Sequence, residues 1–423
     1  MPHSFLPEFT HFLETSPCCF HAINNIKNIL SEKQFIQLRE NQKWKLRPGC
    51  SYFVMRNDAS LIAFTLPVED FHGMRIIASH SDSPAFKVKE NPELETDGHY
   101  IRLNVERYGG MLCAPWLDRP LSVAGRVIVK DSRGNLVSRL VNIDRDLLLI
   151  PNLAIHMNRE ANNGYKYNAQ KDMLPLYGSL TAKGTFMETI AKTADADKSD
   201  ILGHDLFLYN RQKASIWGAS EEFISSGRLD DLQCAFASLK GFLSGKKTSH
   251  LGVYCILDSE EVGSTTRQGA ASTFLYDTLT RILENLGCTR EDYLIHLADS
   301  FMLSADNAHA VHPNHTDKAD PSNRPYLNGG IVLKFNANQK YCTDGISAAM
   351  FRDLCKTAGV PVQTFSNRSD MAGGSTLGNI SNTQVALNTV DIGLPQLAMH
   401  SPYETAGVED TDYLIRAAEA FYC

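Results

Sequence analysis

Residues 250–264, HLGVYCILDSEEVGS, place two adjacent glutamates just after an apolar run. The run, 250–257, is rich in strand-forming residues and predicts a buried strand. In extended backbone, neighbouring side chains point to opposite sides, so Glu260 and Glu261 are not expected to hold one ion from the same face. The two glutamates are better explained by different roles: one carboxylate binds a metal, and the other takes a proton from water. The alternative is a solvent-exposed acidic turn, which the buried strand before it disfavours.

Helical and strand-like segments alternate on both sides of this run. We expect strands at 74–79, 300–305 and 330–335, and helices at 15–33, 229–244, 269–286, 345–358 and from about 409 onward. Such alternation predicts an α/β fold, a layered domain with a mixed sheet. Residues 98–145 instead alternate strand-like runs with Gly- and Asp-containing turns, which indicates mostly β structure. The predicted division is an α/β domain made of 1–90 plus 226–423, interrupted by a β-rich insert at 91–225.

Composition excludes several other classes of protein. The 423 residues carry a formal net charge of -7 and no Lys/Arg-rich run, which argues against a nucleic-acid partner. No apolar stretch approaches the roughly 20 residues that span a bilayer, so we expect no membrane partner. The N-terminus lacks the pattern of a secretory signal, and the ten cysteines form no CxxC pair. We therefore expect reduced thiols and a cytoplasmic protein.

A histidine and an aspartate follow the strand predicted at 74–79. His80 and Asp82 are two residues apart, so in extended chain their side chains point the same way. A metal-binding histidine commonly needs a second group to hold its ring, and His-x-Asp supplies a ligand with its orienter. The alternative is an ordinary hydrogen-bonded histidine at a strand end.

Further potential ligands lie beside other apolar runs. Asp230 and Asp231 precede a helical run, so one of them is expected to cap the helix while the other is free to bridge two cations. Asp306 begins a cluster with three histidines in SADNAHAVHPNH (304–315), of which some are expected to be structural. His400 follows another apolar run, at a predicted strand end.

These segments together predict a metal centre. In open α/β sheets, sites form outside the strand ends, where these groups are expected to meet. Oxygen and nitrogen donors without cysteine suit zinc, cobalt or manganese in a hydrolytic site. Two such metals, bridged by a carboxylate, would activate a water.

The same segments resemble a known family. ASHSDSPAFKVK, GRLDD, DSEEVGS, SADNAHAVHPNH, GGIVLKFNANQKY, GGSTLG and AMHSPYETAG occur in the order typical of the aspartyl aminopeptidases, a family of dinuclear zinc metallopeptidases, and the sequence is similar to its bacterial members. The resemblance spans residues 15–415. It implies an aminopeptidase that removes N-terminal residues, preferentially Asp or Glu, from peptides with a free N-terminus through a water activated by two zinc ions, for which cobalt or manganese can substitute.

The resemblance also implies a role for each matching residue. It assigns His80 and Asp306 to one metal, Glu261 and His400 to the other, Asp230 to the bridge, Glu260 to the general base and Asp82 to the orientation of His80. The insert would serve dimerisation within a tetrahedral dodecamer, a homo-oligomer built of dimers.

Substrate contacts follow from the resemblance as well. His156 would reach into the site of a neighbouring subunit. Lys334 would meet the acidic side chain of the substrate, the alternative being a lysine that snorkels to the surface. Gly374 and Ser375 would let backbone groups approach the substrate, or form a plain turn.

Two differences from the usual sequence of the family leave other functions open. The family more often has Asn where this chain has Asp231, and its usual Cys-Gly-Ser-Thr loop reads MAGGSTLG here. These changes put the substrate preference in doubt, so an aminopeptidase of neutral residues with the same chemistry is one alternative. A non-catalytic assembly protein with a vestigial site is another, against which the complete ligand set argues.

Overall fold

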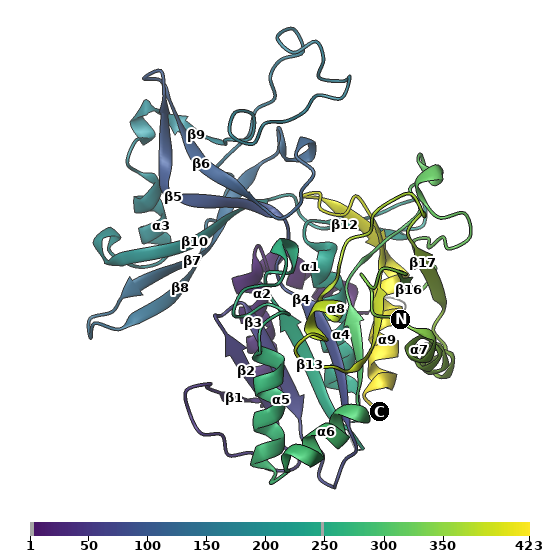
Figure 1. Cartoon of the computed structure of the whole chain (residues 1–423). Helices are drawn as coiled ribbons and strands as arrows, with labels where there is room; N and C mark the ends of the chain where they lie inside the picture. The colour runs from purple at the N-terminus through teal and green to yellow at the C-terminus, as the bar shows by residue number, and fades with distance from the viewer. Residues whose placement is uncertain (1–3, 247–248) are drawn as a thin grey trace.

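The computed structural model describes residues 4–246 and 249–423. Within these ranges the strands form three sheets, of nine, six and five strands, and parallel and antiparallel pairs occur together with helices (Figure 1). The predicted mixed α/β fold is confirmed. No helix in the described ranges is long and apolar enough to cross a membrane.

The nine-stranded sheet is built from both ends of the chain. Its order is β1 (Ile36–Leu38), β2 (Ser51–Arg56), β3 (Ser60–Thr65), β13 (Leu251–Leu257), β4 (Met74–His80), β14 (Phe301–Ala305), β18 (Asn388–Gly393), β16 (Ile331–Phe335) and β17 (Val362–Ser366). Strands β13, β4, β14 and β18 are parallel to one another, whereas β3 is antiparallel to β13 and β16 is antiparallel to β18. The parallel strands end at the same edge of the sheet.

Helices account for most of the remaining regular structure. In the described ranges they are α1 (Leu6–Thr15), α2 (Cys19–Glu32), α3 (Phe186–Thr193), α4 (Leu229–Ser244), α5 (Phe274–Asn285), α6 (Arg290–Ala298), α7 (Gly345–Ala358), α8 (Leu377–Ser381) and α9 (Val408–Phe421).

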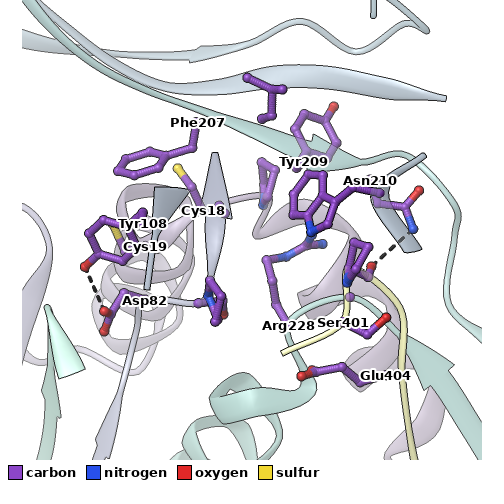
Figure 2. Close-up of a pocket in the computed structure, with 18 of the residues that line it drawn as sticks. Cys18, Cys19, Asp82, Tyr108, Phe207, Tyr209, Asn210, Arg228, Ser401 and Glu404 are labelled. Carbon is purple, nitrogen blue, oxygen red and sulfur yellow. Dashed lines mark hydrogen bonds between the residues drawn. The ribbon is translucent and has the colours of Figure 1, made fainter. Parts of the chain in front are cut away.

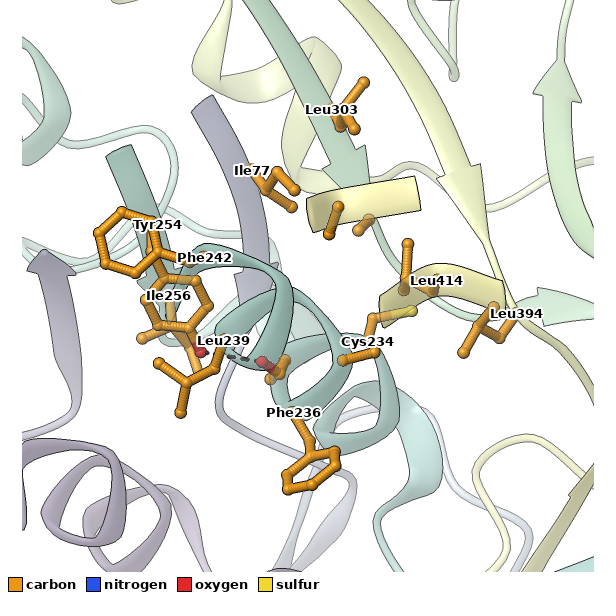
Figure 3. Packing of buried hydrophobic residues seen from close by; sticks show 14 of the residues in the cluster. Ile77, Cys234, Phe236, Leu239, Phe242, Tyr254, Ile256, Leu303, Leu394 and Leu414 are labelled. Carbon is orange, nitrogen blue, oxygen red and sulfur yellow. Dashed lines mark hydrogen bonds between the residues drawn. The ribbon is translucent and has the colours of Figure 1, made fainter. Parts of the chain in front are cut away.

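Apolar layers cover both faces of the nine-stranded sheet, which explains why β13 is apolar throughout. Tyr254 and Ile256 belong to one core with α4 and α9, as Figure 3 shows for the side of the sheet under α4. Val253 and Cys255 point to the opposite face and share a second core with α5. Every residue of β13 is buried. The strand end that carries the glutamates is therefore fixed from both sides.

The six-stranded sheet packs around a core of its own. Its order is β8 (Leu136–Asn142), β7 (Leu121–Lys130), β10 (Ile201–Asn210), β5 (Ala85–Thr96), β6 (Tyr100–Tyr108) and β9 (Leu176–Ser179). The apolar cluster of this sheet runs from Phe86 to Leu208 and includes Phe186 and Ile190 of α3. The sheet extends away from the nine-stranded one (Figure 1). The exact division at residues 91 and 225 stays a prediction.

The five-stranded sheet connects distant segments of the chain. Its order is β11 (Ser215–Trp217), β12 (Phe223–Ser226), β20 (Glu404–Gly407), β19 (Pro395–Leu397) and β15 (Ala308–His309). Asp230 follows β12, Asp306 precedes β15, and His400 lies between β19 and β20. This sheet therefore positions three of the predicted ligands relative to one another.

Candidate active site

The predicted ligands meet at the C-terminal edge of the nine-stranded sheet. Strands β13, β4 and β14 are neighbours and run parallel. His80 is the last residue of β4, Glu260 and Glu261 follow β13, and Asp306 follows β14. The side chains at these strand ends are brought together for the same reason that ligands generally bind at this edge of an α/β sheet.

Asp230 stands between two histidines. Its Oδ1 lies 3.3 Å from His80 Nε2, and its Oδ2 lies 3.4 Å from His400 Nε2. On the His80 side, Asp306 Oδ1 is 3.9 Å from the same imidazole nitrogen. On the His400 side, Glu261 Oε2 is 3.4 Å from His400 Nε2. The five side chains thus form two groups that share Asp230.

The other ring nitrogen of each histidine faces a main-chain carbonyl. His80 Nδ1 is 3.0 Å from the carbonyl oxygen of Asp82, and His400 Nδ1 contacts the carbonyl oxygen of Gly110. A carbonyl can only accept, so each Nδ1 carries the proton in the neutral ring and each Nε2 presents a lone pair. Lone pairs that face carboxylates repel one another unless a proton or a metal cation lies between them.

Asp82 connects the two strand ends. Its carboxylate accepts the backbone N–H groups of Glu260 and Glu261 at 3.1 and 3.2 Å, and its Oδ1 lies 3.5 Å from His80 Nδ1. The carbonyl oxygen of Asp82, at 3.0 Å, is the nearer partner of the ring. Asp82 therefore holds His80 through its main chain and the glutamate turn through its carboxylate.

The concentration of buried acids shifts their protonation. Burial, together with the charges of Asp306, Asp82 and Asp230, raises the pKa of Glu260 to about 8. Burial and the charge of Asp230 raise the pKa of Glu261 well above its ordinary value. Burial lowers the pKa of His400, but Asp230 outweighs it and raises that pKa to about 9. Cations at the centre of the cluster would relieve this repulsion.

The donor atoms also fit a metal. Nitrogen and oxygen atoms of His80, Asp230 and Glu261 lie within 4.8 Å of one another, as do oxygen atoms of Asp230, Asp231 and Asp306. Asp230 Oδ1, Asp231 Oδ1 and Glu261 Oε1 are buried without a hydrogen-bond partner among the described residues. Unsatisfied buried carboxylate oxygens are costly, and metal coordination is one way to satisfy them.

The expectation that one of Asp230 and Asp231 caps a helix is wrong. Helix α4 has no side-chain cap hydrogen bond, and both aspartates depart from helical backbone angles. Their carboxylates turn instead toward the site, where Asp231 Oδ2 accepts the backbone N–H of His80 at 3.1 Å. Burial and the charges of Asp306 and Asp230 raise the pKa of Asp231. Asp231 therefore holds the main chain of His80, a predicted metal ligand, and its carboxyl group adds to the acidic cluster.

A cavity of about 180 Å³ opens beside the cluster. Its lining includes Glu260, Lys334, Gly374 and Ser375. Lys334 is 3% exposed, so it does not snorkel to the surface. Its Nζ donates to the carbonyl oxygen of Asn307 at 2.8 Å and lies 3.6 Å from Asp306 Oδ2. Burial opposes its charge, but Asp306 holds the pKa of Lys334 above its ordinary value.

Three histidines that the sequence analysis singled out, His156, His312 and His315, do not line this cavity. His156 is exposed in the segment between β8 and β9 and does not line this cavity of the described chain. His312 and His315 line a neighbouring cavity, with ring centroids 5.0 Å apart, and only His309 of that cluster lines both cavities. The expectation that some of these histidines are not ligands agrees with this arrangement.

Sequence reasoning missed three supporting residues. Glu404 is 1% exposed and accepts the backbone N–H groups of both Asp230 and His400. Tyr108 donates its hydroxyl to Asp82 Oδ2 at 2.8 Å, in the small cavity drawn in Figure 2, and Gly110 contacts His400. A glutamate inside the otherwise apolar ETAGV was the available signal for Glu404. The other two contacts join segments far apart in sequence.

Comparison with known proteins identifies the family. The family described as aminopeptidase I zinc metalloprotease (M18) matches residues 12–422, nearly the whole chain. This chain belongs to the M18 family. M18 proteins are zinc-dependent aminopeptidases, and the resemblance seen in the sequence is confirmed at this level.

Relatives of similar length support the assignment to the M18 family. A probable M18 family aminopeptidase 2 of Clostridium acetobutylicum is 46% identical over 99% of this chain and 98% of its own. That of Ectopseudomonas mendocina is 42% identical over 97% and 96%.

Solved structures agree with the M18 fold. The structure described as the Ape4 and Nbr1 complex has a TM-score of 0.95 at 36% identity and covers 98% of this chain and 85% of that one. The S. cerevesiae mApe1 dodecamer has a TM-score of 0.87 at 27% identity and covers 99% and 96%.

Proposed function

We propose that this M18 aminopeptidase removes acidic N-terminal residues from peptides at a centre of two zinc ions. The observation that carries the proposal is the position of Asp230, whose two carboxylate oxygens face His80 and His400 at 3.3 and 3.4 Å. His80, Asp230 and Asp306 would hold one zinc ion, and Asp230, Glu261 and His400 the other. Zinc, when bound, lowers the pKa of a water molecule and polarises a carbonyl group.

Glu260 is the proposed general base. It lines the cavity, and the hydrogen bond from its backbone N–H to Asp82 Oδ1 at 3.1 Å fixes the start of its turn. Its carboxylate would take a proton from the attacking water and pass that proton to the leaving amine as the peptide bond breaks.

Lys334 is the proposed contact for an acidic substrate side chain. Its ammonium lines the cavity, and an ammonium has three N–H donors. One of them is used by the carbonyl oxygen of Asn307, and Asp306 lies on another side. The remaining donor would bind a substrate carboxylate, and Gly374 and Ser375 on the opposite loop would face the substrate backbone.

A preference for neutral residues is the second candidate. Asp306 already balances much of the charge on Lys334, at 3.6 Å. Tyr341, Phe365 and Met399 line the same cavity and would suit an apolar side chain. The chemistry at the metal centre would be the same.

Hydrolysis of Asp-, Glu- and Leu-para-nitroanilide separates these candidates. The purified protein is stripped with a chelator, and zinc, cobalt or manganese is then restored. Metal-dependent release from Asp and Glu alone is expected. Release mainly from Leu would favour the neutral preference. No release by fully metal-loaded protein from any of the three, or from short peptides, would favour the non-catalytic assembly protein.

A dodecameric assembly is also part of the proposal. The S. cerevesiae mApe1 structure that this chain resembles is a dodecamer. We propose a tetrahedral dodecamer of this chain, in which the exposed His156 reaches a neighbouring site. Light scattering would then give about twelve times the chain mass of 47.0 kDa, and a monomeric mass would contradict it. The ten free cysteines support a cytoplasmic location.

A further inference from the structure

Residues 108–112, which begin at the last residue of β6, connect the six-stranded sheet with the candidate metal centre; we call this stretch the β6 strap. The carbonyl oxygen of Gly110 contacts His400 Nδ1, and the backbone N–H of Leu112 donates to the carbonyl oxygen of His400 at 3.2 Å. The strap therefore holds both the ring and the main chain of His400. A hydrogen bond of this kind fixes the tautomer of a metal-binding histidine and points its free nitrogen at the metal.

The strap also packs directly against the second ligand of the same group. Gly109 has a positive φ of 78°, and a Cβ placed on it would lie 3.1 Å from Glu261 Cβ and 3.2 Å from the carbonyl oxygen of Glu261. A side chain there would have to push against the main chain of Glu261. Glycine is favoured at this position both for its backbone conformation and because a side chain would displace Glu261 by a few tenths of an ångström.

The residue before these glycines anchors the strap at its other end. Tyr108 donates its hydroxyl to Asp82 Oδ2 at 2.8 Å, as Figure 2 shows. Its ring packs edge-on against Phe207 of β10, with 5.4 Å between centroids. Three consecutive residues of the strap thus contact Asp82, Glu261 and His400, although 150 or more residues of sequence separate the last two from it.

We propose that the β6 strap positions Glu261 and His400, so that the six-stranded sheet sets the affinity of the zinc site that these two residues form. The proposal rests on the two-zinc centre proposed above. It makes Gly109 and Gly110 positioning residues, because they act through the ligands and donate nothing to the metal themselves. The zinc site of His80 and Asp306 has no contact with the two glycines among those described, so it is expected to be unaffected.

Two glycines with a positive φ provide a matched pair of variants. Gly109→Ala introduces the close contact with Glu261. Gly98→Ala, in the turn between β5 and β6, is the control, because Gly98 has a similar φ of 72° but an added Cβ would meet nothing within 4 Å. Gly109→Asn is the second test, because asparagine tolerates a positive φ but still carries the Cβ. An effect shared by both Gly109 variants is then due to the contact with Glu261 and not to backbone strain.

Zinc binding is measured on the full chain by dialysis against buffers of fixed free zinc, followed by elemental analysis. The wild type and Gly98→Ala are expected to bind two equivalents. Both Gly109 variants are expected to retain one, with the second weakened by about 10- to 100-fold, as is typical when the support of a ligand is lost. Cobalt loading gives a spectroscopic check, because the absorption of one bound cobalt should change while that of the other persists.

The outcomes distinguish the two proposals. Two zinc ions bound with unchanged affinity by both Gly109 variants would overturn the role of the strap and leave the two-zinc centre intact. Equal weakening of both ions in the Gly109 variants would also overturn it, because the effect would not be confined to Glu261 and His400. A single zinc ion in the wild type would overturn the two-zinc centre itself, and the strap proposal with it.

Discussion

The carboxylate of Glu404 accepts the backbone N–H of Asp230 at 3.0 Å. Its second oxygen accepts the backbone N–H of His400 at 2.7 Å. One buried side chain thus ties together the main chains of the bridging aspartate and of a histidine ligand. Burial and the charge of Asp230 raise the pKa of Glu404 to about 8. Such a group is kept in the interior only because its hydrogen bonds are made.

Replacing Glu404 with Gln is expected to break one of these two hydrogen bonds. An amide has one acceptor oxygen, so one of the two backbone N–H groups would face an NH₂ group instead. Zinc affinity should fall by about 10- to 100-fold, and the free energy of unfolding of the zinc-free protein by about 1–3 kcal/mol. Zinc titration and urea unfolding measure the two effects. Glu419→Gln, at an exposed position of α9, serves as the control, and equal behaviour of the two variants would contradict the prediction.

Glu260→Gln is expected to abolish most of the turnover while the protein keeps its metal. Removal of a general base typically costs about 10²- to 10⁴-fold in kcat. The backbone N–H of Glu260, which bonds Asp82, is unchanged by the substitution. Steady-state kinetics and elemental analysis test both parts.

Glu261→Gln provides the contrast to Glu260→Gln, because it should lower zinc content as well as turnover. Near-normal turnover of zinc-loaded Glu260→Gln would contradict the assignment of Glu260 as the general base. Loss of zinc from Glu260→Gln would instead make Glu260 a ligand.

Lys334→Met should affect acidic substrates selectively. Loss of a hydrogen bond to a charged group is expected to lower kcat/KM for Asp- and Glu-anilides by about 10- to 100-fold, with Leu-anilide little changed. Assays are run at saturating zinc, because Lys334 also lies 3.6 Å from Asp306. Lys340→Met, at an exposed position nearby, is the matched control. An equal loss on all three substrates would show that Lys334 acts through Asp306 alone.

Asp205 of β10 is predicted to make the stability of the six-stranded sheet pH-dependent. It accepts from Lys87 Nζ at 2.8 Å and from Arg126 Nε at 3.0 Å. Burial opposes the charged form, but these cations hold the pKa of Asp205 below its ordinary value. The stabilisation is therefore present above the pKa of about 4 in the unfolded chain and is lost as pH falls through the lower folded value.

Asp205→Asn should accordingly lower the free energy of unfolding at pH 7 by about 1–2 kcal/mol. The difference from wild type should shrink as pH is lowered below about 4. Urea unfolding at several pH values measures it, with the exposed Asp97→Asn as control. A difference that stays constant across this pH range would contradict the role of the Asp205 charge.

Much of the fold was predictable because the sequence pattern of most segments favours the same secondary structure that tertiary packing stabilises. The helices expected at 229–244 and 345–358 have these bounds in the structure, and β13 occupies 251–257. The helix expected at 15–33 begins only at Cys19, because α1 ends at Thr15 and a short connection with Pro17 separates the two helices. The hairpin of β2 and β3 was missed; its two strands pair with each other, and β3 also pairs with β13.

The candidate ligands were predictable for a different reason. Each is a charged or imidazole side chain placed at the end of an apolar run, which is unusual unless a partner is present. One of Asp230 and Asp231 was wrongly expected to cap a helix, because an aspartate before a helix commonly has that role. Gly109 and Gly110 carry no such signal, since what makes them important is the distance to Glu261 and His400 in the folded chain.

The five-stranded sheet has a consequence for synthesis on the ribosome. Its strands bring Asp230, Asp306 and His400 into register only when β20, which begins at Glu404, has been added. A nascent chain that ends before residue 404 therefore carries most of the acidic side chains of the site but lacks the strand that sets them in register. Metal binding by the proposed centre is accordingly expected only after β20 has been translated, and a fragment that stops short of it should bind zinc more weakly than the whole chain.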